Sequence, residues 1–229
     1  MKRPLQVAID GPVASGKSTV AARLAQRLGC TFLDTGALYR AVALLALERG
    51  VSTDDEAAVV ALLEREPPQI SEGGPSGGAY TIRVAGKEVA QELFAPPVSR
   101  AVSSIAAMRG VRERLVPTQR GFADERDVVM AGRDIGTVIL PHATVKFFLT
   151  ATLDARVDRR LSELREQGIQ MDRVALRAEI ERRDQRDRAR KTSPLVKAPD
   201  AVEVDTSKLS VDQVVELLER GVRAAAAKL

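Results

Sequence analysis

The sequence predicts an α/β fold in which helices cover both faces of a parallel central sheet. Short apolar stretches alternate with longer helical patterns along most of the 229 residues, and this alternation is typical of β-α-β units. Aromatic residues make up only 3% of the chain and Trp is absent, so Val, Leu, Ile and Ala must fill the core, as in parallel sheets. The length suits one domain with insertions, spanning residues 1–229.

A phosphate-binding motif follows the first apolar stretch, Leu5–Asp10. It matches the pattern G-x-x-x-x-G-K-[ST], and with the next residue it comprises Gly11, Pro12, Val13, Ala14, Ser15, Gly16, Lys17, Ser18 and Thr19. Backbone N–H groups of such a loop face phosphate oxygens, and the helix N-terminus adds partial positive charge. Lys17 supplies a charge for the β and γ phosphates, and Ser18 a hydroxyl ligand for Mg²⁺. We therefore expect a nucleoside triphosphate to bind here.

The residues around the motif support this interpretation. Val20, Leu24 and Leu28 recur at helical spacing, and Gly29 is placed as a helix stop. Strand, loop and helix thus stand in the order typical of P-loop NTPases, which predicts their three-layer α/β/α fold. A short strand is expected next at 31–33, and a helix at 36–49 with Gly50 behind it.

Composition changes in the following segment. Thr53-Asp54-Asp55-Glu56 has the form of a capping box, which would open a helix that ends before Pro67. From Gln69 to Ala95, alternation at Tyr80–Val84 and a glycine-rich turn at 73–78 predict a small antiparallel β insert. Helical spacing resumes at 98–122. We expect it to be broken near Gly110 and kinked at Pro117.

The second half of the chain continues the alternation. Strands are predicted at 127–131, 145–149 and 202–204, and helices at 153–167, 172–191 and 210–228. Ligands of parallel sheets gather outside the carboxyl ends of the strands. Gly11, Asp34 and Asp134 all fall at such ends, so we expect one site there.

Charge and cysteine content exclude several classes of protein. The net charge is +4, and the eleven arginines between Arg156 and Arg190 are interleaved with eight carboxylates, which argues against a nucleic-acid partner. The lone Cys30 allows no intramolecular disulfide and fits a reducing compartment. No signal pattern and no apolar run of about 18 residues is present, which predicts a cytoplasmic protein without membrane association.

Four groups of residues indicate that the triphosphate reacts with a second, anionic small molecule. They are Thr35, Tyr39 and Arg40 at a helix start; Arg133 and Asp134 at a strand end; Arg183, Asp187 and Arg190 at i, i+4, i+7; and Arg156, Arg159 and Arg160 on the helix after a strand. Guanidinium groups bind phosphate, and a mobile arginine-bearing lid stabilises charge during transfer. Each group also has a plainer interpretation: a packing ring, a surface ion pair or a solvated basic helix. His142 is expected at the surface.

Four motifs together resemble the bacterial cytidylate kinases of the nucleoside monophosphate kinase type. They are Ile9-Asp10-Gly11-Pro12, Leu33-Asp34-Thr35-Gly36-Ala37-Leu38-Tyr39-Arg40, Gly132-Arg133-Asp134-Ile135-Gly136-Thr137-Val138 and Arg183-Asp184-Gln185-Arg186-Asp187-Arg188. The resemblance implies transfer of the γ-phosphoryl group of ATP to CMP or dCMP with Mg²⁺. It also implies a monophosphate-binding lobe at about 35–122, with the β insert at 69–95, a helical lid at about 153–192, and a monomer.

The resemblance also implies roles for particular residues. Arg40 and Arg133 would hold the acceptor phosphate, Arg183 and Asp187 its sugar, and Ser103, Arg112 and Asp134 the cytosine, with Thr35, Tyr39 and Arg190 nearby. The residues expected to act in catalysis are Lys17, Arg133, Asp134, Arg156 and Arg160.

Two other functions remain open on the sequence. One is a kinase for a different small anionic acceptor, such as another nucleoside monophosphate or a shikimate-like molecule. The other is a nucleotide-regulated binding module, in which the arginine-rich helices would contact a partner. The chain lacks the Asn/Thr-Lys-x-Asp pattern that reads guanine, which weakens the second alternative.

Overall fold

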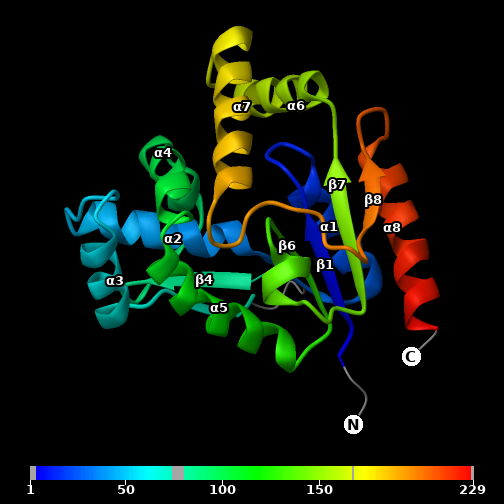
Figure 1. Cartoon of the computed structure of the whole chain (residues 1–229), viewed down its shortest axis with the longest axis horizontal. Helices are drawn as coiled ribbons and strands as arrows, with labels where there is room; N and C mark the ends of the chain where they lie inside the picture. The colour runs from blue at the N-terminus through cyan, green and yellow to red at the C-terminus, as the bar shows by residue number, and fades with distance from the viewer. Residues whose placement is uncertain (1–3, 74–79, 167, 228–229) are drawn as a thin grey trace.

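The α/β fold is confirmed in a computed structural model, which describes residues 4–73, 80–166 and 168–227. A five-stranded parallel sheet lies at its centre (Figure 1). In spatial order its strands are β2 (Thr31–Asp34), β6 (Val128–Gly132), β1 (Gln6–Asp10), β7 (Val145–Thr150) and β8 (Val202–Asp205). β1 and β6 are buried along their whole length, which explains their uninterrupted apolar sequences.

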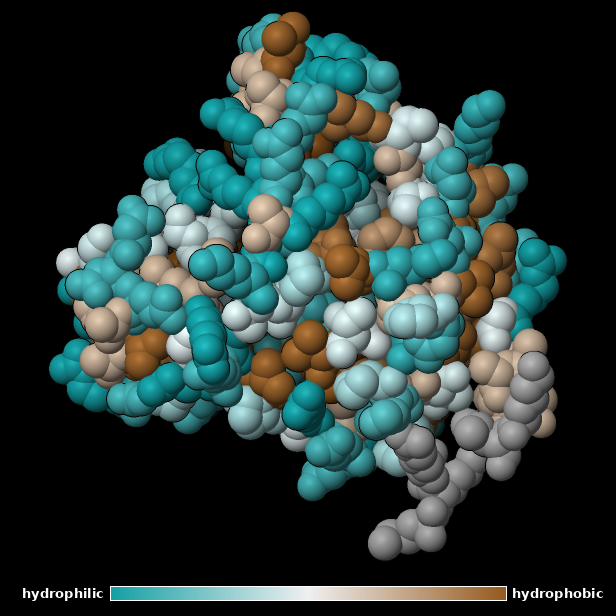
Figure 2. Space-filling view, viewed as in Figure 1, coloured by the Kyte–Doolittle hydropathy of each residue, from teal (hydrophilic) through white to brown (hydrophobic). Residues whose placement is uncertain are grey.

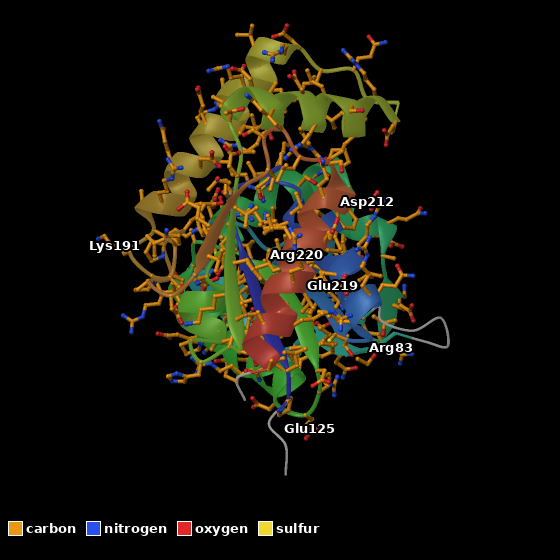
Figure 3. All side chains as sticks on the ribbon, turned by 90° about the vertical axis from the view of Figure 1, so that its right-hand side faces the viewer. Arg83, Glu125, Lys191, Asp212, Glu219 and Arg220 are labelled. Atoms are coloured by element: carbon orange, nitrogen blue, oxygen red, sulfur yellow. The ribbon has the colours of Figure 1, made fainter. Side chains whose placement is uncertain are left out.

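Helices cover both faces of this sheet. On one face, α1 (Lys17–Leu28) and α8 (Val211–Ala226) pack apolar side chains against β1, β6, β7 and β8. Asp212 and Glu219, labelled on α8 in Figure 3, also form ion pairs with Arg23 and Arg27 of α1. On the other face, the end of α5 (Arg109–Asp124) and a π-helical turn, η2 (Ile135–Ile139), pack against β1, β2 and β6. The predicted three layers are therefore present.

A second core lies beside the sheet, at the left of Figure 1. Its elements are α2 (Thr35–Glu48), α3 (Glu56–Arg65), β3 (Gln69–Glu72), β4 (Tyr80–Val84), β5 (Lys87–Val89), the 3-10 turn η1 (Gln91–Phe94) and α4 (Pro96–Ile105), with the start of α5. The three strands form a separate antiparallel sheet, as the alternation at Tyr80–Val84 predicted. Most of the predicted turn at 73–78 lies outside the described residues.

The helices α6 (Leu153–Glu166) and α7 (Arg173–Ala189) form a pair with its own apolar cluster. In Figure 1 the arrow of β7 points toward this pair, so the pair stands above the carboxyl ends of the strands. The space-filling view shows the pair projecting at the top, with a mostly hydrophilic surface (Figure 2). The predicted helix ends at 167 and 228 lie outside the described residues.

One local prediction was wrong, and some local features differ from the predicted positions or were not predicted. The predicted capping box at Thr53 does not form, because Asp55 caps α3 and accepts a hydrogen bond from the backbone N–H of Ala58. The break between α4 and α5 falls at 106–108, and Gly110 lies in the first turn of α5. Pro117 lies inside α5. The π-helical turn η2 and the turn η1 were not predicted.

Candidate active site

The phosphate loop joins β1 to α1 in the predicted geometry. Gly16 has φ 84°, a left-handed conformation that glycine adopts without strain, and it immediately precedes α1. At Gly11 a side chain would lie 2.3 Å from the carbonyl oxygen of Leu149, so the loop requires glycine there. The buried Lys17 donates from Nζ to the carbonyl of Pro12 at 3.0 Å. Its ammonium group is thus held inside the loop.

Ser18 and Asp34 place oxygen atoms beside this loop. The Ser18 hydroxyl donates to Oδ2 of Asp34 at 2.6 Å. The other oxygen of Asp34 accepts the backbone N–H of Gly36 at 2.9 Å and so caps α2. A hydroxyl from the first turn of α1 and a carboxylate from the end of β2 therefore stand together, and hard divalent cations prefer such oxygen ligands.

The start of α2 presents the predicted hydroxyl, ring and guanidinium. Thr35 is buried and donates to the carbonyl of Ala131 on β6 at 3.1 Å. The Tyr39 ring lies under the guanidinium of Arg112, 5.2 Å from the ring centroid. Arg40 donates to Ser99 Oγ at 2.9 Å and to the carbonyl of Leu93 at 3.1 Å. Contacts from η1 and α4 therefore fix the position of Arg40.

A buried ion pair joins α5 to the end of β6. Arg112, only 2% exposed, donates from Nη2 to the carboxylate of Asp134 and from Nη1 to the carbonyl of Ala106. Its Nε is buried without a hydrogen-bond partner among the described residues, and the same holds for Ser103 Oγ on α4. Unpaired buried donors are costly, and each is available to a ligand.

A second buried carboxylate, Asp187 on α7, lies between two arginines. Its Oδ2 accepts from Arg133 Nε at 2.8 Å, and its Oδ1 accepts from Arg190. Burial raises the pKa of Asp187, but the charges of Arg133 and Arg190 lower it more, so it lies below its ordinary value. Asp187 is therefore ionised near neutral pH and neutralises part of this arginine cluster.

Arg183 carries a charge that no hydrogen-bonded acid balances among the residues that the structure describes. Burial, reinforced by the charge of Arg133, lowers the pKa of Arg183 to about 10. Burial also lowers the pKa of Lys17 well below its ordinary value, and Arg133 and Arg183 lower it further. Since these effects require proximity, the three cations from β6, α7 and the phosphate loop face one region. An anion there would relieve their mutual repulsion.

The predicted arginines of α6 occupy different positions. Arg156 is buried and pairs with Asp184 at 2.6 Å, and it donates to the carbonyl of Val13 in the phosphate loop at 3.2 Å. Arg160 pairs with Glu163 at 2.8 Å, and its charge contributes to lowering the pKa of Arg40. Arg159 contacts Thr206, after β8, and the carbonyl of Ser15.

The structure thus brings most of the predicted residues to one edge of the sheet. Two contributors were missed. Sequence reasoning did not assign a partner to Ser18, although Asp34 ends the strand next to β6. It also gave no role to Thr206, because one hydroxyl in a loop carries no pattern. Within the described residues, no group of three or more His, Cys, Asp or Glu side chains could hold a metal ion, and no helix is long and apolar enough to cross a membrane.

Comparisons with known proteins agree with this geometry. The structure resembles the crystal structure of an uncharacterized protein from Eubacterium ventriosum, with a TM-score of 0.54 at 15% identity, covering 97% of this chain and 99% of the other. That likeness concerns the fold.

Sequence relatives are more specific. The chain is 47% identical to a cytidylate kinase of Geobacillus kaustophilus over 94% of its own length and 95% of the relative's. It is 44% identical to a cytidylate kinase of Streptococcus pneumoniae, covering 95% and 96% of the two chains. The sequence profile described as cytidylate kinase matches residues 7–224. The chain therefore belongs to the cytidylate kinase family.

Proposed function

We propose that this chain transfers the γ-phosphoryl group of ATP to CMP, giving ADP and CDP, and that dCMP is a second acceptor. The observation that carries the proposal is that the buried Lys17 lies inside the phosphate loop while Arg133, paired with Asp187 of α7, lies at the end of the neighbouring strand β6. Phosphoryl transfer places two anions end to end, and their repulsion must be offset by fixed positive charge. The named cytidylate kinases among the relatives supply the acceptor.

The donor side is the phosphate loop. Backbone N–H groups of the loop from Gly11 to Thr19, except at Pro12, would bind the phosphates of ATP, and Lys17 would neutralise the group in transfer. The ammonium group is already positioned by the carbonyl of Pro12. A bound phosphate would add an anion that offsets the charges of Arg133 and Arg183, which favours the protonated form of Lys17.

Ser18 and Asp34 fit the requirements of Mg²⁺. Their oxygens form a hard donor pair next to the loop, and protein sites for this ion usually supply one or two such ligands, with water and phosphate completing the shell. When bound, the ion would neutralise charge between the β and γ phosphates. The hydrogen bond to Asp34 fixes the orientation of the Ser18 hydroxyl for this role.

The acceptor side comprises α2, β6 and α7. Arg40 and Arg133 would hold the CMP phosphate, and Arg183 with Asp187 would hold the sugar, beside Arg190, Thr35 and Tyr39. The contacts of Arg40 with η1 and α4 and of Arg133 with Asp187 limit their rotamers. Such preorganisation reduces the entropy lost when the acceptor binds.

Arg112 and Asp134 would discriminate between pyrimidines, together with Ser103. Cytosine presents an amino donor at N4 and an acceptor at N3, whereas uracil presents a carbonyl and an N–H. The free Nε of Arg112 is available to donate and Asp134 to accept. Against UMP, both buried groups would face the wrong partner, and such a mismatch is strongly disfavoured.

The lobe at about 35–122 and the helix pair at about 153–192 would close over the two substrates. Arg156 already connects the pair to the phosphate loop through the carbonyl of Val13, and Arg160 lies near Arg40. Closure would carry these arginines to the group in transfer and exclude water. We expect the enzyme to act as a cytoplasmic monomer.

The proposal is tested by measuring ATP consumption with a panel of acceptors: CMP, dCMP, UMP, AMP and shikimate. We expect CMP to saturate the enzyme at the lowest concentration, and CDP to appear in equal amount to ADP. Preference for another acceptor would reassign the substrate, and ATP consumption without any acceptor dependence would contradict kinase activity.

A further inference from the structure

Asp10 is the last residue of β1 and directly precedes Gly11 of the phosphate loop. Its side chain is only 4% exposed, and no role has been given to it above. Burying a carboxylate is costly, so a fold that retains one at this position must satisfy it with strong hydrogen bonds.

Both carboxylate oxygens of Asp10 accept hydrogen bonds from the backbone of one turn. Oδ1 accepts the backbone N–H of Ile135 and Oδ2 that of Gly136, each at 2.8 Å. These N–H groups belong to the first turn of η2, which follows Arg133 and Asp134 without a gap. Hydrogen bonds to an ionised acceptor are about twice as strong as neutral ones, so this contact fixes the turn.

The surroundings allow the turn little freedom. At Gly136 a Cβ would lie 3.1 Å from Lys146 Cδ and 3.4 Å from Asp10 Oδ2. At Gly132 a Cβ would lie 2.6 Å from Thr35 Oγ1. Asp10 also pairs in register with Gly132 across β1 and β6. The carboxylate therefore lies between the start of the phosphate loop and the turn that carries the acceptor-binding pair.

We infer that Asp10 is a positioning residue that sets Arg133 and Asp134 relative to the phosphate loop. It acts through the backbone of Ile135 and Gly136 and does not itself touch either substrate. This inference rests on the proposed function, because it assigns Arg133 and Asp134 to the CMP side. Its signature is a selective loss of CMP affinity when Asp10 is changed.

The test uses the full chain and Asp10→Asn, which keeps the shape and one acceptor but presents an amide donor to the second N–H. CMP and ATP binding are each measured by titration calorimetry, and KM values by coupled assay. We expect the Kd for CMP to rise about tenfold, in line with the loss of one charge-assisted hydrogen bond, while the Kd for ATP changes less than about twofold. Asp10→Ala, which removes both acceptors, should increase the loss further.

Ser210→Ala is the matched control. Ser210 caps α8 and also accepts a backbone N–H, but α8 packs on the face of the sheet that α1 covers. This variant should lower the thermal midpoint and leave both Kd values unchanged. Equal weakening of CMP and ATP by Asp10→Asn, or no weakening of CMP, would overturn the inference. Failure of the unmodified chain to bind CMP would instead contradict the proposed function.

Discussion

In the proposed function, the buried pair of Arg112 and Asp134 is the part of the site that recognises cytosine. Both are almost fully buried, and they approach from α5 and from the end of β6. A buried pair is a weak source of net stability, since desolvation offsets much of the attraction. We propose that its value lies in orientation: Asp134 holds the guanidinium while the buried Nε has no hydrogen-bond partner within the described part of the chain.

We predict that Asp134→Asn raises the KM for CMP about tenfold or more and leaves the KM for ATP nearly unchanged. The substitution removes the charged acceptor that orients Arg112, and it replaces one carboxylate oxygen by a donor. Steady-state kinetics with each substrate varied in turn provide the measurement. Equal increases for both substrates would move Asp134 out of the acceptor site.

A pH-dependent prediction concerns Asp10. Burial raises the pKa of Asp10 from 3.8 to about 6 in the folded protein, against the opposing hydrogen bonds from Gly136 and Ile135. Between about pH 4 and pH 6, the folded state therefore holds a proton on Asp10 that the unfolded state has released. This contribution to stability is complete below about pH 4 and is lost as the pH rises through about 6, a change on the order of 3 kcal/mol.

Chemical unfolding of the unmodified chain and of Asp10→Asn at pH 4 and pH 7 measures this contribution. The unmodified chain should lose about 2–3 kcal/mol relative to the variant between these two pH values, because Asn does not titrate. Subtracting the change in unfolding free energy of the variant from that of the unmodified chain cancels the contributions of most other carboxylates, which both proteins share. A difference that stays constant with pH would mean that Asp10 titrates at its ordinary pKa.

Residue types were more predictable than residue partners. Lys17 was assigned to the site from its motif, Arg133 from its place at a strand end, and Asp187 from helical spacing. The i, i+4, i+7 spacing brought Asp187 and Arg190 to one helix face, but it did not reveal that Asp187 also joins Arg133, because that contact spans 54 residues. Asp10 belonged to a recognised motif, but its partners lie 125 and 126 residues away. Contacts of this kind depend on the sheet register, which periodicity does not encode.

At the scale of elements, the passage from β6 into η2 is the most constrained segment. A Cβ at position 132 would lie 2.6 Å from Thr35 Oγ1 and 2.7 Å from Ile135 Cδ1, so a residue with a side chain does not fit there without a shift. Asp10 holds the turn that follows. We predict that Gly132→Ala destabilises the protein by about 1–3 kcal/mol, the usual cost of overpacking a core, and weakens CMP binding. Thermal unfolding and CMP titration measure the two effects.

Gly121→Ala provides the control for that substitution. Gly121 lies in α5, and a Cβ there meets no atom within 4 Å. Alanine favours helix over glycine by about 0.5–1 kcal/mol, so this variant should be slightly more stable with unchanged activity. Similar stability losses in both variants would show that the packing at Gly132 is not special.

Elements with strong periodicity were predicted within a few residues, as α1 and β1 show. Terminal details were not. Thr53 and Asp55 both suit a helix N-cap, and the choice of Asp55 depends on where α3 packs. The π-helical turn η2 leaves no periodic signal in five residues. Its conformation is set by Asp10 and by the apolar layer of Ile135 and Ile139 beneath the sheet.

At the scale of the whole molecule, three bodies meet at the carboxyl edge of one sheet. The sheet supplies the phosphate loop, the lobe supplies Arg40 and Arg112, and the helix pair supplies Arg183 and Asp187. The lobe and the helix pair each have an apolar cluster of their own, which supports the proposal that each moves as a unit against the sheet. Apolar side chains join the lobe to the sheet, as Tyr80 does against Phe32. The helix pair also meets the site through polar contacts, such as Arg133 with Asp187 and Arg156 with the carbonyl of Val13. Such contacts exchange more readily than packed cores do.

This division predicts that ATP hydrolysis without CMP is slow, on the order of a hundredfold or more below CDP formation, because water is excluded only when both bodies close. Arg183 and Arg133 repel each other and Lys17 until an anion lies among them, so ATP alone brings only part of the charge that favours closure. Phosphate release from ATP, measured with and without CMP, gives the ratio. Replacing CMP by cytidine, which lacks the phosphate, should leave hydrolysis slow. A nonreactive CMP analogue that keeps the phosphate should slow the hydrogen exchange of the backbone amides in the helix pair. Rapid hydrolysis with ATP alone would mean that the acceptor phosphate is not needed for closure.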